Sequence, residues 1–194
     1  MNIPSAAARI AAVLAMALLG ALSDRAAADD ARRVAPYAAT PDPVVAAMLA
    51  MAGVGPQDYL IDLGSGDGRL VIAAAAQRGA RGLGVDIDAG LVEIANRNAA
   101  RDGVTGRALF REQDLFETDL GEATVVTIYL FPSIMGRVAA KLRRELKPGA
   151  RVVVHDFPLP GWRVDRVDSF DVAEKRDYTF NNRATLYLYT VPSR

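Results

Sequence analysis

Short apolar runs alternate with helical patterns through most of this chain, and that alternation restricts the possible folds more than any other feature. Runs typical of strands occupy residues 58–63, 80–87, 107–114, 123–131 and 150–157, and helical patterns occupy residues 41–52, 69–79, 90–103 and 133–146. The run ATVVTIYLF at 123–131 is almost entirely apolar, which suits a strand that is buried on both faces of a parallel sheet. The pattern predicts an α/β fold with a doubly wound, mostly parallel sheet.

After residue 157 the alternation stops. RVDRVDSFDV at 163–172 and RATLYLYTV at 183–191 read as two strands with no helix between them, and their connection contains Asn181 and Asn182. We expect them to form a C-terminal antiparallel hairpin, which brings the sheet to seven strands. In a sheet of this kind a ligand binds at the carboxyl ends of the strands, beside the first strand of the domain.

Composition excludes several kinds of chemistry. The 194 residues suit one globular domain, and the 23 basic and 23 acidic side chains give no net field that would attract a polyanion. There is no cysteine and the single histidine is His155, so thiolate zinc sites, cysteine nucleophiles and multi-histidine metal sites are ruled out. We expect no metal site and no nucleic-acid partner.

The N-terminus has a different character from the rest of the chain. Arg9 precedes the apolar stretch at residues 10–22, and Ala26-Ala27-Ala28 offers a small-residue cleavage site. Residues 1–28 therefore read as a signal peptide, with an uncleaved membrane tether, a misplaced start or a plain amphipathic helix as alternatives. Residues 29–40 would then be a linker and residues 41–194 the folded domain, which is exported to the periplasm, tethered to the inner membrane, or held at the cytoplasmic face.

The stretch DLGSGDGR at residues 62–69 follows the first predicted strand. Gly64, Gly66 and Gly68 form G-x-G-x-G at the strand-to-helix turn, whereas a dinucleotide site prefers G-x-G-x-x-G, which would place a glycine at Arg69. Asp62 suits a ligand with a cationic amine better than a pyrophosphate. Asp86, at the end of the second strand, is placed to accept hydrogen bonds from both ribose hydroxyls.

A nucleoside that carries an amino acid meets both demands, and S-adenosylmethionine is such a molecule. DLGSGDG, GVDID at 84–88 and EQDLFE at 112–117 resemble the motifs of the class I, seven-β-strand S-adenosylmethionine-dependent methyltransferases over residues 36–191. The resemblance implies a cofactor site formed by the residues of these motifs, together with two that precede the first helix: Asp62, Gly64, Ser65, Gly66, Gly68, Asp86, Ile87, Asp114, Leu115, Tyr37 and Thr40. It places Asp114 against the adenine amino group.

A narrower resemblance is to the small protein-lysine N-methyltransferases whose eukaryotic members act in mitochondria on membrane proteins, and to their bacterial relatives. It is carried by residues 37–75, 114–134 and 146–157, and it implies a lysine of a protein substrate, which can be a membrane protein, as the methyl acceptor. This chain reads YAATP at 37–41 where the relatives tend to read YVPTP, and YLFPS at 129–133 lacks the leading Asn or Asp and the paired prolines of nucleic-acid amino-methyltransferases. Base methylation is therefore disfavoured.

Methyl transfer from a sulfonium needs positioning more than it needs a reactive side chain. We expect Tyr129, Phe131 and Pro132, at the end of the fourth strand, to form the acceptor pocket, with Tyr129 as a wall and a possible proton partner; ordinary core packing is the alternative for Tyr129.

Three other features have two interpretations each. Tyr37 and Thr40 either touch the methionine end of the cofactor or serve as a loop anchor and helix N-cap. His155 either assists the acceptor at the rim or is a hydrogen-bonded strand-end histidine, and as a strand neighbour of Asp156 it should point to the opposite face. The basic residues along 137–151, Lys141 among them, read as a solvated helix face rather than a nucleic-acid patch.

Other functions stay open at this point: methylation of a small molecule, a non-catalytic cofactor-binding protein of the envelope, and a NAD-type dehydrogenase. An exported enzyme also lacks an evident supply of S-adenosylmethionine, which is made in the cytoplasm. An uncleaved tether with the domain facing the cytoplasm would remove that conflict.

Overall fold

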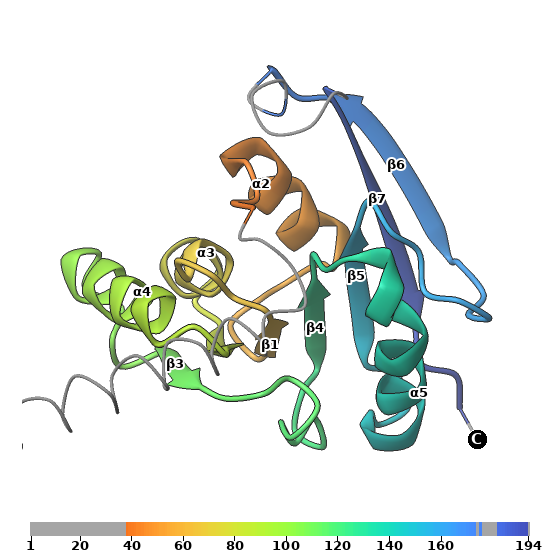
Figure 1. Cartoon of the computed structure of the whole chain (residues 1–194), viewed down its shortest axis with the longest axis horizontal. Coiled ribbons are helices and arrows are strands. Elements are labelled where there is room, and N and C mark those ends of the chain that lie inside the picture. Colours follow the sequence, from red (N-terminus) through yellow and green to blue (C-terminus); the bar gives the residue numbers. More distant parts are fainter. Residues whose placement is uncertain (1–37, 174, 176–181, 194) are drawn as a thin grey trace, which may run out of the picture. The chain divides into compact units, whose positions relative to one another are not determined.

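The structure is a computed structural model and describes residues 38–173, 175 and 182–193. The helices in this part of the chain are α2 (Asp42–Met51), α3 (Arg69–Arg78), α4 (Ala89–Arg101) and α5 (Met135–Glu145), with a short 3₁₀ helix, η1, at Pro132–Ile134. The strands are β1 (Tyr59–Leu63), β2 (Arg81–Asp86), β3 (Ala108–Glu112), β4 (Val125–Ile128), β5 (Arg151–His155), β6 (Arg166–Asp171) and β7 (Arg183–Thr190) (Figure 1).

These strands form one sheet in the order β3-β2-β1-β4-β5-β7-β6. β1 to β5 are parallel, while β7 is antiparallel to both β5 and β6. The predicted mostly parallel seven-stranded sheet with a C-terminal antiparallel pair is confirmed. Because β1 pairs with β2 on one side and β4 on the other, the chain changes direction across the sheet at β1, and the carboxyl ends of β1 and β4 border the crevice where a ligand is expected.

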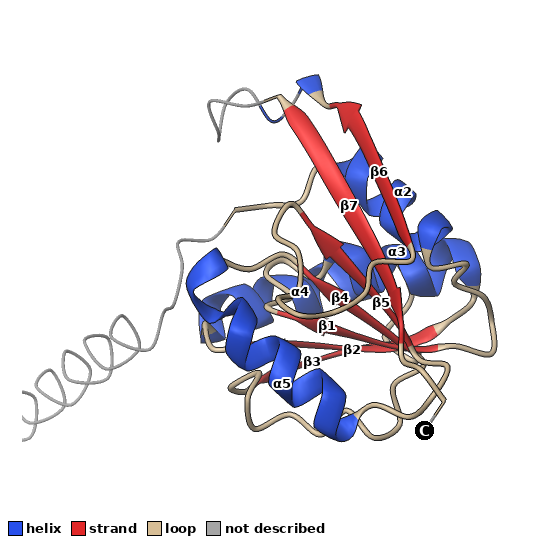
Figure 2. Ribbon diagram, turned by 90° about the vertical axis from the view of Figure 1, so that its right-hand side faces the viewer, coloured by secondary structure: helices blue, strands red, loops and turns tan. Residues whose placement is uncertain are grey.

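Two cores form, one on each face of the sheet. Alternate residues of each strand point to opposite faces, so Leu60 and Val125 pack with α2, α3 and α4, whereas Ile61 and Val126 pack with α5. Figure 2 shows α5 in front of the strands and α2 and α3 behind them. The fourth strand is buried along its whole length, as its apolar run predicts.

The start of α2 differs from the prediction. The N-cap position is occupied by Pro41, without a side-chain cap, so the expectation that Thr40 is the N-cap is wrong. Thr40 lies one residue earlier and is 9% exposed. The chain enters the helix through the extended conformation of Pro41, and Pro43 sits in the first turn, where a missing N–H group costs nothing.

The fourth strand ends earlier than its apolar run suggests. β4 pairs only as far as Ile128, and the chain from Tyr129 to Phe131 continues past the edge of the sheet. Pro132 has no N–H group for a strand ladder and instead opens η1. This early end brings Tyr129 and Phe131 to the ligand-binding edge.

The basic face of α5 is not solvated throughout, contrary to the prediction. Lys141 is only 3% exposed; its Nζ donates to the carbonyl of Phe116 at 3.2 Å and to Glu145 Oε2 at 2.6 Å. Lys141 therefore ties α5 to the loop after β3 rather than facing water. Arg137 packs its guanidinium 3.8 Å from the centroid of the Phe116 ring.

The hairpin strands pack as expected. Tyr189 is fully buried, and its hydroxyl accepts a hydrogen bond from the Leu159 N–H at 2.9 Å. Of the two asparagines predicted in the connection, Asn182 is described and Asn181 lies outside the described residues.

Predictions for the N-terminal region concern residues that are almost all outside the described part. The signal peptide at 1–28 and most of the linker at 29–40 fall there, as does Tyr37. Among the helices of the described residues, none is long and apolar enough to cross a bilayer. The same residues contain no group of three or more acidic, histidine or cysteine side chains placed to share a metal ion.

Candidate functional site

The glycine loop connects β1 to α3 in a conformation that its sequence permits. Gly64, Gly66 and Gly68 all have positive φ, at 80°, 53° and 82°. Space is also limiting: a Cβ on Gly68 would lie 2.6 Å from the Phe110 ring, and one on Gly64 would lie 2.8 Å from Leu130 Cδ2. Backbone conformation and packing thus explain why residues 64 and 68 are glycines. Glycine at these two positions does not by itself indicate a ligand.

Asp86 lies at the carboxyl end of β2 and holds the glycine loop. Its Oδ2 accepts from the Gly66 N–H at 2.9 Å and its Oδ1 from the Asp88 N–H at 3.0 Å. Each carboxylate oxygen has a second lone pair, so Asp86 can accept from two further donors such as vicinal hydroxyls. Ile87 follows it and is half-buried, which leaves part of an apolar side chain beside the same position.

Asp62 is a buried carboxylate with a perturbed pKa. It is 6% exposed and accepts a hydrogen bond from the Thr127 hydroxyl at 2.7 Å. Burial raises its pKa to about 7, the Thr127 hydrogen bond opposes this, and the nearby charges of Asp86 and Asp67 add to the rise. A cation beside Asp62 would stabilise the ionised form, so the site favours a positively charged group such as an α-ammonium.

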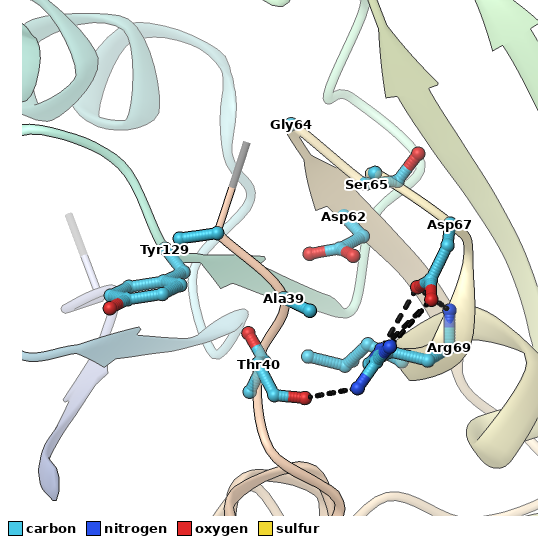
Figure 3. Close-up of a pocket in the computed structure, with 11 residues that line it drawn as sticks. Ala39, Thr40, Asp62, Gly64, Ser65, Asp67, Arg69 and Tyr129 are labelled. Carbon is cyan, nitrogen blue, oxygen red and sulfur yellow. Dashed lines mark hydrogen bonds and ion pairs between the residues drawn. The ribbon is translucent and has the colours of Figure 1, made fainter. Parts of the chain in front are cut away.

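A single pocket brings several of the predicted residues together (Figure 3). Its walls come from the glycine loop, the end of β1, the start of α3, the segment before α2 and the end of β4: Ala38, Ala39, Thr40, Asp62, Gly64, Ser65, Gly66, Asp67, Arg69, Leu70 and Tyr129. Asp62 and Tyr129 therefore line one cavity, although they belong to segments that are far apart in the sequence. The hydroxyl of Ser65 is buried against Gly84 of β2, where a Cβ would come within 2.6 Å of it.

The loop after β3 carries the predicted adenine-side residues, which are not among the residues that line this pocket. Asp114 is exposed, and its Oδ1 accepts from the Phe116 N–H at 2.8 Å. Leu115 is 7% exposed and packs in the core on the α5 face. The Gln113 N–H donates to the Asp86 carbonyl at 2.9 Å, which fixes this loop beside β2.

Tyr129 stands on the other side of the pocket, where it stacks on His155. The two ring centroids are 4.0 Å apart with an interplanar angle of 31°. Burial raises the pKa of Tyr129 to about 12, and the charge of Asp156 adds to the rise. The phenol therefore stays protonated at neutral pH, and Tyr129 is suited to be a pocket wall or a hydrogen-bond donor but not a base.

His155 and Asp156 do not point to opposite faces, so that prediction is wrong. Asp156 lies just beyond β5 with φ of 64°, which turns its carboxylate back toward the strand and places Oδ1 3.4 Å from His155 Nε2. This contact lacks hydrogen-bond geometry, and among the described residues neither ring nitrogen of His155 has a hydrogen-bond partner. His155 is fully buried, so it is neither a rim residue nor the hydrogen-bonded histidine of the alternative interpretation.

Electrostatics at this strand end are balanced by a lysine that sequence reasoning missed. Lys175 is 4% exposed, and its Nζ donates to Asp156 Oδ2 and to the Arg183 carbonyl. The other oxygen of Asp156 accepts from the Thr185 N–H at 3.0 Å. Burial lowers the pKa of His155 to about 4, which Lys175 reinforces and Asp156 opposes, so the imidazole is neutral at physiological pH.

Phe131 and Pro132, the other predicted acceptor residues, are exposed at the start of η1. Phe131 is 43% exposed, an unusual position for a large aromatic side chain. Neither is among the residues that line the pocket with Tyr129, and their place in an acceptor site stays a prediction.

Two functional candidates were missed in the glycine loop itself. Arg69 marks the departure from the dinucleotide motif, and its guanidinium makes a bidentate ion pair with Asp67. The two candidates are Arg69 and Asp67. The sequence signal for them was only that each lies next to a glycine of the loop. The hydrogen bond from Thr127 to Asp62 could not be predicted from the sequence, because the two residues meet only through the pairing of β1 and β4.

The sheet order, the glycine loop, a carboxylate at the end of β2 and a buried acid that favours a cation together define a class I S-adenosylmethionine-dependent methyltransferase. The residues present fit the cofactor on the evidence of the structure itself, since Asp62 suits its ammonium group and Asp86 its ribose. The model of the ANTKMT methyltransferase domain matches residues 62–166, and the chain belongs to this family. The class predicted from the motifs is confirmed.

Individual proteins similar to this chain carry two kinds of name. It is 40% identical over 157 residues to a protein-lysine N-methyltransferase of Saccharolobus islandicus, covering 80% of this chain and 93% of that protein. It is 38% identical over 122 residues to the adenine nucleotide translocase lysine N-methyltransferase of Mus musculus, covering 58% of this chain and 53% of that protein. A crystal structure of an RNA methyltransferase from Salinibacter ruber, in complex with S-adenosyl-L-homocysteine, is 45% identical with a TM-score of 0.72, covering 81% of this chain and 95% of that one.

Proposed function

We propose that this enzyme methylates the ε-amino group of a lysine side chain in a protein. The observation that carries the proposal is the 40% identity to a protein-lysine N-methyltransferase across nearly all of that relative. The mouse relative, which this chain matches over about half of its length, is also named for a lysine acceptor.

The neutral, partly aromatic acceptor side of the pocket is consistent with this acceptor. Neutralising a lysine at pH 7 costs roughly 4–5 kcal/mol, because its unperturbed pKa is about 10.4. Tyr129 and His155 are both uncharged at that pH, and the carboxylate of Asp156 is paired with Lys175. A wall without net charge disfavours the ammonium form of the acceptor and so lowers that cost.

The chain's own residues would bind and orient the two reactants. Asp62 would hold the α-ammonium of the cofactor, Asp86 its ribose hydroxyls, and Tyr129 the acceptor side chain. When bound, S-adenosylmethionine would supply an electrophilic methyl group, carried on a positively charged sulfur, to the acceptor nitrogen. Alignment of these groups can account for roughly 7–11 kcal/mol of the rate enhancement.

An RNA acceptor is a second candidate, because the similar Salinibacter ruber structure is that of an RNA methyltransferase. A decisive assay would incubate the full chain and labelled S-adenosylmethionine with total protein, membrane protein and RNA in separate reactions. Label on lysine, identified by mass spectrometry and absent with the Asp86→Ala variant, would support the proposal. Label confined to RNA would overturn it, and label confined to small molecules would point to the metabolite alternative.

We further propose that the acceptor protein lies in a membrane and that the N-terminal segment keeps the enzyme beside it. The support is the apolar stretch at residues 10–22, the exposed Phe131 two residues after the pocket residue Tyr129, and the resemblance to enzymes that act on membrane proteins. A reporter that is active only outside the cytoplasm, fused after residue 194, tests the orientation. Reporter activity would contradict a tethered domain that faces the cytoplasm and would favour export.

A further inference from the structure

Residues 38–40 form one side of the cofactor pocket. Ala38, Ala39 and Thr40 line the same cavity as Asp62 and Gly64. Figure 3 shows Ala39 and Thr40 across the cavity from Asp62 and Gly64. Thr40 is buried, and α2 begins two residues later at Asp42. A ligand in this cavity would therefore be covered on one side by a short segment of chain that belongs neither to the sheet nor to the glycine loop.

Arg69 is placed to hold that segment. It is the first residue of α3 and directly follows Gly68, so its side chain leaves the helix at the end that borders the pocket. A dinucleotide motif would have a glycine at this position, which could make no such contact. The side chain is 33% exposed, so it is partly covered by its neighbours.

The guanidinium connects two walls of the pocket. Arg69 Nε lies 2.9 Å from Asp67 Oδ1 and Nη2 lies 2.6 Å from Asp67 Oδ2, while Nη1 donates to the Thr40 carbonyl at 2.9 Å. The carbonyl of Asp67 accepts from Asn98 Nδ2 at 3.0 Å, which fixes the loop to α4. Asp42 Oδ1 is 3.7 Å from Nη1, but this carboxylate is 91% exposed and adds little.

We propose that Arg69 is a positioning residue for the cofactor: by joining Thr40 to Asp67, it holds residues 38–40 against the pocket and slows dissociation of the ligand. The planar fork of the guanidinium is what allows one side chain to bind a carboxylate with two N–H groups and a carbonyl with a third. The proposal rests on the cofactor site and is independent of the acceptor, so a failure to find a lysine substrate would leave it intact.

The test compares wild type with Arg69→Met in the full chain, using S-adenosyl-L-homocysteine as the ligand. Stopped-flow measurements give the dissociation rate, and hydrogen exchange reports on residues 38–45 with and without ligand. Because hydrogen bonds to a charged group are lost, we expect dissociation to become about tenfold faster, with the association rate changed less than about threefold. Exchange of residues 38–45 should also become faster, and the protection that the ligand gives them should be lost.

Three further variants separate the possible causes. Arg78→Met, on an exposed residue in the last turn of the same helix, should change neither measurement. Asn98→Ala loosens the glycine loop without touching Thr40, so it should leave the exchange of residues 38–45 unchanged. Arg69→Lys keeps the charge but not the fork and should give an intermediate dissociation rate; it also serves as the test if Arg69→Met does not fold.

Two results would overturn the proposal. The first is an unchanged dissociation rate in a folded Arg69→Met variant. The second is faster dissociation with unchanged exchange of residues 38–45, because Arg69 would then act only through Asp67 and the glycine loop.

Discussion

The two halves of the ligand-binding edge are built differently. The cofactor half, at the ends of β1 and β2, uses carboxylates that accept from backbone N–H groups, as Asp86 does from Gly66 and Asp88. The acceptor half, at the ends of β4 and β5, uses buried and half-buried side chains from distant segments: Tyr129 stacks on His155, and Asp156 pairs with Lys175. The cofactor half holds negative charge that a cationic ligand can neutralise. In the acceptor half, the negative charge of Asp156 is already neutralised by Lys175.

This difference suggests separate requirements. A cationic cofactor gains from a buried acid that has no positive partner in the described part of the chain, and the pKa of Asp62, raised to about 7 by burial, is the cost of that arrangement. An amine that must lose its proton gains from surroundings without net charge. The predictions below test each half of this comparison.

The largest effect should come from Lys175→Met in the acceptor half. The variant leaves the carboxylate of Asp156, which is only 17% exposed, without its cation, so we expect a loss of roughly 3–5 kcal/mol in the free energy of unfolding, measured by urea denaturation. Lys147→Met, which breaks an exposed pair with Glu122, is the control and should cost less than about 1 kcal/mol. Adding Asp156→Asn to Lys175→Met should recover part of the loss; no recovery would mean that packing of the lysine stem dominates.

In the cofactor half, Asp62→Asn should stabilise the ligand-free protein at high pH. The folded-state pKa is raised from 3.8 to about 7, so wild type loses stability as the pH rises from about 4 to about 7. The shift corresponds to roughly 4 kcal/mol at most. Asparagine can still accept from Thr127 but carries no charge, so the variant should be more stable than wild type at pH 8 and similar to it at pH 4. A difference that does not depend on pH would contradict the raised pKa.

Asp86→Ala should weaken cofactor binding by at least about a hundredfold in calorimetric titration. It removes two acceptors for the ribose and releases the backbone N–H groups of Gly66 and Asp88, and hydrogen bonds to a charged acceptor contribute about 1.5–3 kcal/mol each. Asp102→Ala, on an exposed residue after α4, is the control. Micromolar binding retained by Asp86→Ala would show that the ribose is held elsewhere.

Affinity for S-adenosylmethionine should fall in wild type as the pH is lowered. Protonated Asp62 cannot attract the ammonium group, so the affinity should drop by up to about tenfold for each pH unit below 7. Titrations at pH 5.5, 6.5 and 7.5 would measure the slope. Asp62→Asn should bind weakly with no such slope, and a flat profile in wild type would mean that another group sets the charge.

The smallest effect should come from Tyr129→Phe. Because the pKa of the phenol is raised to about 12, the hydroxyl cannot act as a base near neutral pH, and its removal should lower kcat/KM by less than about threefold. Tyr129→Ala, which removes the wall and the stack on His155, should lower it by at least about tenfold. Equal losses in the two variants would assign a chemical role to the hydroxyl instead.

Sequence reasoning succeeded where the signal is local. The apolar runs predicted the strands, and the order of Asp62, the glycines and Asp86 predicted the class of cofactor, because residues of one loop or one strand end stay together in any fold that forms those elements. It failed where the direction or burial of a side chain depends on backbone conformation or on a contact with a distant residue. The positive φ of Asp156 reversed the expected direction of its side chain, and Lys141, predicted to face solvent, is buried against the loop after β3.

The sequence by itself determined the fold class, the cofactor and the family, since periodicity, glycine spacing and acids at strand ends are written in consecutive residues. Only the tertiary structure decided how the site is assembled. The pairing of β1 with β4 gave Asp62 its partner Thr127, the antiparallel β7 brought Thr185 to Asp156, and the return of residues 38–40 over the glycine loop gave Arg69 its contact with Thr40. These contacts join residues far apart in the chain, and their geometry exists only once the two cores have packed the strands and helices together.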